Sequence, residues 1–247
     1  MSDRTPVVTL SGVSKSFGVV QALRGVDLAL YPGEVHALVG ENGAGKSTLV
    51  KMLAGVHQPD TGQVVIDGQP VTLHGPADAR NRGIAVIHQH PNLFPDLDVA
   101  ENIYMQRQPR DRFGRVAWSQ LYRDAEALIA SLGAQISVKT PVQGLSIADQ
   151  QLVEIAKALS LDAKVLVMDE PTASLSAREV EELMAIVRRL RDNGAAILFV
   201  SHRLEEVFAL CDRVTVFRDG AFVITAPTAD LSLDATIGHM VGRRLDT

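Results

Sequence analysis

The sequence predicts an α/β domain in which a parallel sheet is covered by helices on both faces. Several short runs are almost entirely apolar, which is typical of strands buried on both faces: 35–39, 84–87, 165–168 and 196–200. Other segments carry apolar residues at helical spacing and predict amphipathic helices: 118–132, 147–159, 178–192 and 204–210. The two kinds of segment alternate over much of the chain, which favours one sheet between helical layers.

Composition and charge narrow the class of protein. The 247 residues are 46% hydrophobic and 21% charged, which is ordinary for a soluble globular chain. The formal net charge of −5 argues against wholesale nucleic-acid binding. The longest apolar run, 195–200, is far shorter than the ~20 residues of a membrane helix, and the polar residues 1–6 do not resemble a signal peptide. We therefore expect a cytoplasmic protein whose one cysteine, Cys211, is a buried, reduced thiol.

Two regions depart from the alternating pattern. Residues 7–38 read as short strands, and 64–71 as a hairpin with Asp67-Gly68 at its turn. From about residue 98 to residue 160 the pattern is mainly helical, with a loop rich in proline and arginine at 106–115. We interpret that loop as solvated and mobile, not as an anion site, because its proline and glycine favour irregular backbone.

A glycine-rich segment carries the strongest chemical signal. Residues 40–48 fit the pattern G-x-x-x-x-G-K-[ST], with a predicted strand before them and a predicted helix after. In such a loop, backbone N–H groups and a helix N-terminus converge on phosphates. We expect Lys46 to reach the β- and γ-phosphates of a nucleoside triphosphate, and the Ser47 hydroxyl to bind Mg²⁺. The other expected nucleotide contacts are Gly40, Asn42, Gly43, Ala44, Gly45 and Thr48.

Polar side chains also follow three other predicted strands. Asp169 and Glu170 end the apolar run 165–168, Gln89 follows 84–87, and His202 follows 196–200. Because parallel strands present their carboxyl ends at one edge, we expect these side chains to meet the phosphate loop there. Asp169 is then a candidate for holding Mg²⁺ through its water shell, and Glu170 for the general base that polarises an attacking water.

The segment 145–151 has two interpretations. Ser146 stands where a helix N-cap belongs, three residues before Asp149, so an ordinary capped helix explains it. Alternatively, the helix N-terminus presents its amides and a hydroxyl to an anion. Periodicity alone favours the first interpretation.

The order of these motifs resembles the nucleotide-binding domain of ABC transporters over essentially the whole chain. The resemblance rests on the phosphate loop, Gln89, Leu145-Ser146, Asp169-Glu170-Pro171-Thr172 and His202. Within that family the chain looks most similar to the ATPases of bacterial monosaccharide importers, on segments 151–159, 174–179 and 199–206. The resemblance implies a P-loop NTPase (RecA-like) core with an antiparallel β subdomain and an inserted α-helical subdomain. It implies a single domain over 1–247, with the core at about 1–97 and 161–225, the helical subdomain at about 98–160 and a tail at 226–247.

The resemblance also implies roles and partners. Phe17 would stack on adenine, Gln89 would sense Mg²⁺ and the lytic water, and His202 would contact the γ-phosphate. The substrate would be ATP with Mg²⁺. Two such domains would enclose two ATP molecules head to tail, with Ser146 of each closing the site of the other. The further partners would be membrane permease subunits and, indirectly, a periplasmic sugar-binding protein, so that the chain would work at the inner face of the cell membrane.

The sequence departs from the family's pattern in three places. In the common signature Leu-Ser-Gly-Gly-Gln, the last three residues are here Ile147, Ala148 and Asp149. Alanine at 148 would cost stability or affinity if the position needs a positive φ or a close approach to phosphate. Ser176 stands where many relatives have aspartate. Relatives in the sugar-import branch usually carry two such domains, whereas this sequence ends at Thr247.

Three other functions fit the motifs less well. A DNA-repair or translation ATPase of the same family usually needs coiled-coil insertions or basic linkers, and the sequence has neither. A small-molecule kinase would not need Leu145-Ser146 or His202. A domain that binds ATP but barely hydrolyses it would not need both Glu170 and His202. We interpret His88 and His90 as loop residues and not as metal ligands, because no further cysteine or histidine completes a site.

Overall fold

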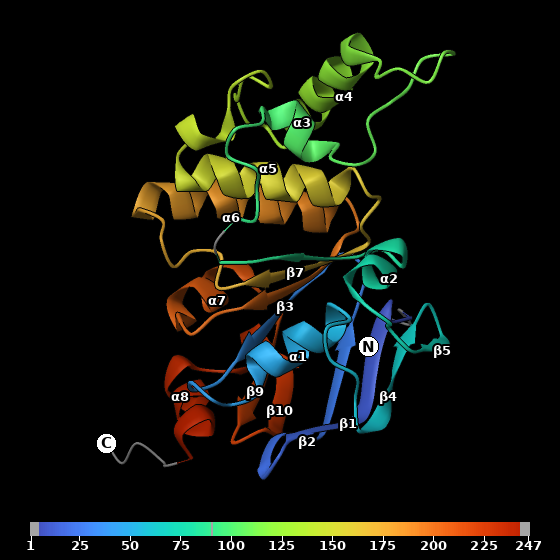
Figure 1. Ribbon diagram of the computed structural model, residues 1–247. Helices are drawn as coiled ribbons and strands as arrows, with labels where there is room; N and C mark the ends of the chain where they lie inside the picture. The colour runs from blue at the N-terminus through green and yellow to red at the C-terminus, as the bar shows by residue number, and fades with distance from the viewer. Residues whose placement is uncertain (1–4, 90, 243–247) are drawn as a thin grey trace.

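The computed structural model describes residues 5–89 and 91–242, and contains two sheets (Figure 1). The six-stranded sheet has the order β10-β9-β3-β8-β7-β6. Its strands are β3 (Glu34–Val39), β6 (Ile84–Ile87), β7 (Val165–Asp169), β8 (Ala196–Val200), β9 (Arg213–Arg218) and β10 (Ala221–Pro227). All neighbours pair in parallel except β10, which is antiparallel to β9. The predicted α/β fold with a parallel sheet is therefore confirmed.

The second sheet is antiparallel and has the order β2-β1-β4-β5. Its strands are β1 (Val8–Phe17), β2 (Val20–Leu30), β4 (Thr61–Ile66) and β5 (Gln69–Val71). The predicted Asp-Gly hairpin is confirmed, because Asp67 and Gly68 join β4 to β5 with φ values of 48° and 76°. Positive φ at both turn residues matches the right-handed twist of the strands, and asparagine, aspartate and glycine tolerate it best.

Helices cover both faces of the six-stranded sheet. They are α1 (Lys46–Leu53), α2 (Pro76–Asn81), α3 (Val99–Ile103), α4 (Trp118–Ser131), α5 (Ile147–Leu159), α6 (Ala177–Asp192), α7 (Leu204–Leu210) and α8 (Leu233–Val241). Figure 1 shows α5 and α6 above the sheet and α3 and α4 above α5, while α1 lies between the two sheets. α8 packs against β9 and α7. Among the described residues, no helix has the length and apolar character needed to cross a membrane.

Alternating side chains of the parallel strands build two cores. Along β3, Val35, Ala37 and Val39 face α5, α6 and α7 in one hydrophobic cluster. Leu38 faces the other way and joins the cluster formed with α1 and the four-stranded sheet. Successive side chains of a strand point to opposite faces of the sheet, and here both faces are buried. This explains why these strands are apolar at almost every position. Cys211 is buried at the edge of the first core, where burial raises the pKa of its thiol, in line with an unreactive cysteine.

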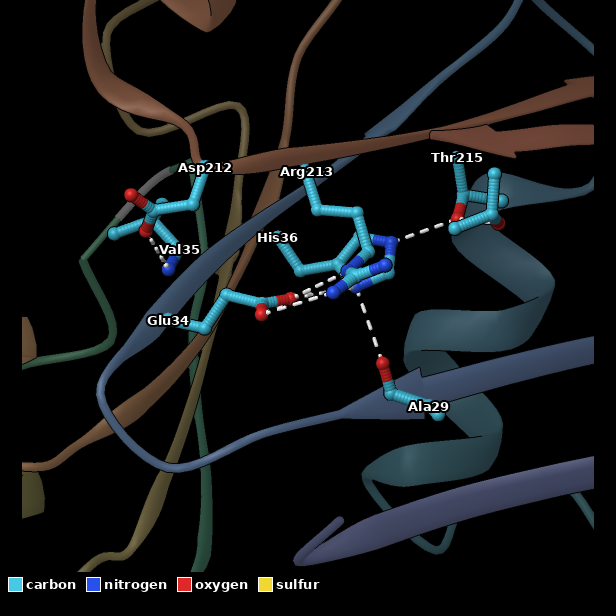
Figure 2. A network of polar contacts seen from close by, with 8 residues as sticks. Ala29, Glu34, Val35, His36, Asp212, Arg213 and Thr215 are labelled. Atoms are coloured by element: carbon cyan, nitrogen blue, oxygen red, sulfur yellow. Dashed lines mark hydrogen bonds and ion pairs between the residues drawn. The ribbon is translucent and has the colours of Figure 1, made fainter. Parts of the chain in front are cut away.

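A buried histidine joins the two sheets (Figure 2). His36 on β3 contacts the Ala29 carbonyl of β2 through Nδ1 at 3.1 Å, and the Thr215 hydroxyl of β9 through Nε2 at 2.7 Å. A carbonyl can only accept, so Nδ1 carries the hydrogen and Nε2 accepts from Thr215. The Thr225 hydroxyl then donates to Thr215 Oγ1 at 2.5 Å. Burial, followed by the charge of Arg213, lowers the pKa of His36 to about 3.

We expect this histidine to make the free energy of unfolding fall in mild acid. His36 is neutral in the folded chain, whereas an unfolded histidine binds a proton below about pH 6.5. The stabilisation is therefore complete above pH ~6.5 and is lost, by about 1.4 kcal/mol per pH unit, as the pH falls towards 3. Urea unfolding at several values between pH 7.5 and pH 5 measures this slope. His36→Gln keeps polar groups in place without the titration, so equal slopes in the two proteins would contradict the assignment.

Candidate active site

Four neighbouring strands bring the expected site residues to one edge of the six-stranded sheet. β3, β8, β7 and β6 are adjacent and parallel, so their carboxyl ends lie together. β3 runs into the phosphate loop, β7 ends at Asp169, and Gln89 and His202 lie two residues beyond β6 and β8. The structure therefore places these segments at one edge of the sheet, as the sequence predicted. Phe17 comes from the other sheet, at the end of β1, and Ser146 caps α5 in the helical layer.

The phosphate loop is shaped by glycines that have no room for a side chain. Gly45, directly before α1, has φ +100°, and a Cβ there would lie 2.6 Å from the Ala22 carbonyl oxygen of β2. A Cβ on Gly40 would overlap the Phe217 carbonyl oxygen of β9. The loop is therefore packed directly on the backbone of both sheets. The sequence pattern predicts glycine at 40 and 45, but the backbone that each one meets is distant in sequence.

Lys46 is buried inside this loop. The residue is only 7% exposed, and its Nζ donates to the carbonyl oxygens of Gly40 at 2.7 Å and Glu41 at 3.0 Å. Burial lowers its pKa, while the charges of Glu170 and Asp169 act in the opposite direction. The ammonium group is thus held within the curve of the loop, at the N-terminus of α1. A bound phosphate would supply the negative charge that this desolvated cation lacks.

Two carboxylates lie side by side across from the lysine. Burial, and then the neighbouring charge of Glu170, raises the pKa of Asp169. Glu170 has a φ of 49°, which is strained for a residue with a side chain, and its N–H donates to the Val200 carbonyl of β8 at 2.9 Å. This bond fixes the strained turn to the next strand. Glu170 Oε1 also lies 3.2 Å from His202 Nδ1, so the residues expected to act together are in hydrogen-bond contact.

A further contact behind this turn was not foreseen from the sequence. The hydroxyl of Thr172, which is 2% exposed, donates to Oε2 of Glu206 at 2.6 Å. Glu206, a buried carboxylate of α7, also pairs with Arg203 at 3.1 Å. The pair therefore ties the loop after Glu170 to the segment after His202. The only signal in the sequence is an acid in the first turn of a helix, which normally lies in solvent.

The donor set at the edge suits a magnesium ion. A hydroxyl, a carboxylate and an amide oxygen, from Ser47, Asp169 and Gln89, are the hard oxygen ligands that Mg²⁺ prefers. Burial, and then the neighbouring charge of Glu170, raises the pKa of Asp169, and a divalent cation would offset both effects. Among the described residues no group of three or more His, Cys, Asp or Glu could hold a metal by itself, so nucleotide oxygens and water would complete the shell. His90 lies outside the described residues.

Ser146 has the geometry of a helix cap. Its hydroxyl accepts from the Asp149 N–H at 3.1 Å and donates to the Asp149 carboxylate at 3.0 Å. Ala148 lies within α5, and none of the positive φ values among the described residues falls on it. Position 148 therefore does not need a positive φ, and the alanine carries no backbone strain for that reason. The second expected cost, crowding of a phosphate by the methyl group, belongs to the assembled site.

The edge of this sheet, with its phosphate loop, paired acids and histidine, has the arrangement of a P-loop nucleotide-binding site. The chain belongs to the ABC transporter family, whose family model matches residues 23–173. It is 60% identical over 241 residues to "Ribose import ATP-binding protein RbsA 2" of Streptomyces avermitilis, and 57% identical over 240 residues to a protein of Rhodococcus jostii named "Ribose import ATP-binding protein RbsA". These alignments cover 98% and 97% of this chain but 48% of each relative. The chain thus spans about half the length of the curated relatives that it matches.

Solved structures agree with this fold. An ATP-binding cassette of an ABC transporter, MJ1267 in its ADP conformation, superposes with a TM-score of 0.82 at 25% identity, covering 97% of this chain and 100% of that one. The cbiO1 protein of Clostridium perfringens, part of an ABC transporter complex, has a TM-score of 0.81 at 24% identity and covers 97% and 96% of the two chains.

Proposed function

We propose that this chain is an ATPase domain that powers the import of a sugar through a membrane ABC transporter. The observation that carries the proposal is the meeting of Lys46, Asp169, Glu170 and His202 at one sheet edge. The printed names of the relatives, which describe ribose import, support the sugar as the transported substrate. Phosphate release from ATP by the purified chain, with Mg²⁺ and with EDTA, tests the catalytic part of the proposal.

Each residue has a role that its position allows. The loop amides and Lys46 bind the β- and γ-phosphates, and Lys46 exchanges its two carbonyl acceptors for phosphate oxygens. Ser47, Asp169 and Gln89 would hold Mg²⁺, which would neutralise negative charge on the phosphates. Glu170 takes the proton of the attacking water as general base. His202, hydrogen-bonded to Glu170, orients that carboxylate and contacts the γ-phosphate.

The assembly completes each site with a second ATPase domain. In a head-to-tail dimer, Ser146 and the N-terminus of α5 face the phosphates bound by the partner domain. The helices α3, α4 and α5, within about 98–160, form the subdomain that carries this surface. The core is formed by about 1–97 and 161–225, and 226–247 is the C-terminal tail. The proposed location is the cytoplasmic face of the membrane, with a periplasmic sugar-binding protein as an indirect partner.

We propose that the permease docks on the segment 91–97, which is partly exposed and held in shape. Phe94 is 51% exposed and Pro95 is exposed, while Pro91, Leu93 and Leu97 are half-buried and Leu93 packs against the hydrophobic core. The buried Asn102 side chain accepts from the Phe94 N–H at 2.7 Å and donates to its carbonyl at 3.0 Å. A cavity of about 350 Å³ lies beside this segment and is lined in part by His88, Asn92 and Glu154. An exposed phenylalanine whose backbone is held by a buried asparagine favours a docked partner.

We expect a cysteine at position 94 to crosslink to the permease. Phe94→Cys in the complete transporter should react across a short bifunctional linker with the cytoplasmic face of the permease, because apolar docking brings the two surfaces into contact. Phe113→Cys is the matched control, since Phe113 is 66% exposed but lies in the loop of residues 106–115. Gel shifts of the two variants in membranes measure the result. Crosslinks from position 113 and none from position 94, in an active transporter, would place the interface elsewhere.

A further inference from the structure

The ring expected to carry the base lies at an exposed hairpin tip. Phe17 is 44% exposed and is followed by Gly18 at φ +59° and by Val19, which is fully exposed at 102%. A side chain at such a tip has few neighbours on its own hairpin. To serve as a stacking surface for a base, its ring needs support from another part of the chain.

That support comes from the segment after α1, residues 57–60. The rings of His57 and Phe17 have centroids 5.0 Å apart and planes at 63°, an edge-to-face contact. Asp60 Oδ2 accepts from the Ser16 N–H at 2.7 Å, and Oδ1 accepts from Lys15 Nζ at 2.7 Å. The Asp60 N–H in turn donates to the Ser14 carbonyl at 2.9 Å. The three residues before Phe17 are therefore fixed by one aspartate, and its ring by one histidine.

The same segment is attached to the helix that starts at the phosphate loop. α1 begins at Lys46 and ends at Leu53, and the N–H groups of Val56 and His57 donate to the Lys51 carbonyl at 2.8 and 3.3 Å. The supports of Phe17 are thus connected through α1 to the loop that would hold the phosphates. Since base and phosphates belong to one ligand, this connection sets the spacing between their two sites.

Lys15 also contacts the Phe17 ring. Its ammonium lies over the ring, 5.7 Å from the centroid, while it is paired with Asp60. The steep angle of the His57 ring means that His57 does not occupy the parallel stacking position of a base.

We propose that His57 and Asp60 are positioning residues for the nucleotide base, acting through Phe17. The proposal rests on the proposed function, in which Phe17 stacks on adenine. His57 holds the plane of the ring, and Asp60 holds the backbone that carries it and balances the charge of Lys15. Neither residue needs to touch the phosphates, so their effect should appear only with ligands that have a base.

The expected result is a change in binding without a change in chemistry. His57→Ala should raise the KM for ATP about two- to tenfold, which corresponds to the usual strength of one aromatic pair, and leave kcat nearly unchanged. His57→Phe should restore the KM, because it keeps an edge-to-face ring. Affinity for inorganic tripolyphosphate, which has no base, should be the same in the parent and in both variants. A merely destabilised loop would instead weaken both ligands.

A double-mutant cycle separates this inference from the proposed function. In a Phe17→Ala background, His57→Ala should have no further effect on the KM, because the ring that it supports is gone. An undiminished effect in that background, or equal weakening of ATP and tripolyphosphate, would overturn the role of His57 and leave that of Phe17 intact. An unchanged KM in Phe17→Ala alone would remove Phe17 from the base site, and this inference with it. Asp60→Asn, measured in the same way, should follow His57→Ala.

Discussion

Lys46→Ala is expected to abolish measurable ATP binding, or nearly so. The ammonium group is buried in the loop, and its two present acceptors are carbonyl oxygens of the loop itself. In the proposed function this ammonium binds the β- and γ-phosphates through charge-assisted hydrogen bonds, which are stronger than neutral ones and would be lost with it. Titration calorimetry with Mg·ATP measures the loss directly.

The matched control for this variant is Lys51→Ala. Lys51 lies on the same helix, but it is exposed. Its removal changes the net charge of α1 by the same amount and should leave ATP affinity within a few-fold of the parent, because charges in solvent are screened. Unchanged affinity in Lys46→Ala would mean that the phosphates bind elsewhere.

Glu170→Gln should keep ATP binding and lower turnover by about two to four orders of magnitude. This is the usual contribution of a positioned general base, and the amide has nearly the same shape as the carboxylate that it replaces. His202→Ala should give a loss of similar size, since His202 Nδ1 lies 3.2 Å from the Glu170 carboxylate. Single-turnover phosphate release, together with ATP binding by each variant, measures the effect on chemistry apart from binding.

An acid elsewhere in the loop provides the control for Glu170. Glu41→Gln removes the same charge from an exposed side chain of the phosphate loop and should leave turnover within a few-fold of the parent. If Glu170→Gln retained full activity while Glu41→Gln lost it, the base would have to be sought among the loop residues.

Periodicity predicted the buried strands and the long helices well. β6, β8, α5 and α7 have the predicted bounds, because each is either apolar throughout or regularly amphipathic. β9, β10 and α8 were not predicted. The strand β10 alternates half-buried with exposed residues at the edge of the sheet, and the short α8 has only Thr236 and Met240 buried. Where the local pattern is this weak, tertiary packing and not local sequence decides which secondary structure the segment adopts.

The chemical residues were found for two different reasons. Lys46 follows from the phosphate-loop motif, whereas Asp169, Glu170 and His202 follow from strands that end at one edge. Phe17 was named only through the family resemblance, since nothing local distinguishes a phenylalanine at a strand end. The contacts that support the site join segments that are distant in sequence. Glu206, for example, lies 34 positions after its partner Thr172, a separation at which local sequence patterns carry no information.

Gly43 and Gly45, the last two glycines of the phosphate loop, should differ in the substitutions that they tolerate. At Gly43, with φ +85°, a Cβ would meet no atom within 4 Å, so the constraint is torsional and asparagine or aspartate satisfies it best among the larger residues. At Gly45 a Cβ would press on the Ala22 carbonyl and on the Leu23 side chain at 2.6 and 2.8 Å. Any other residue there must separate the loop from β2, so position 45 admits no substitute that keeps the two sheets in place.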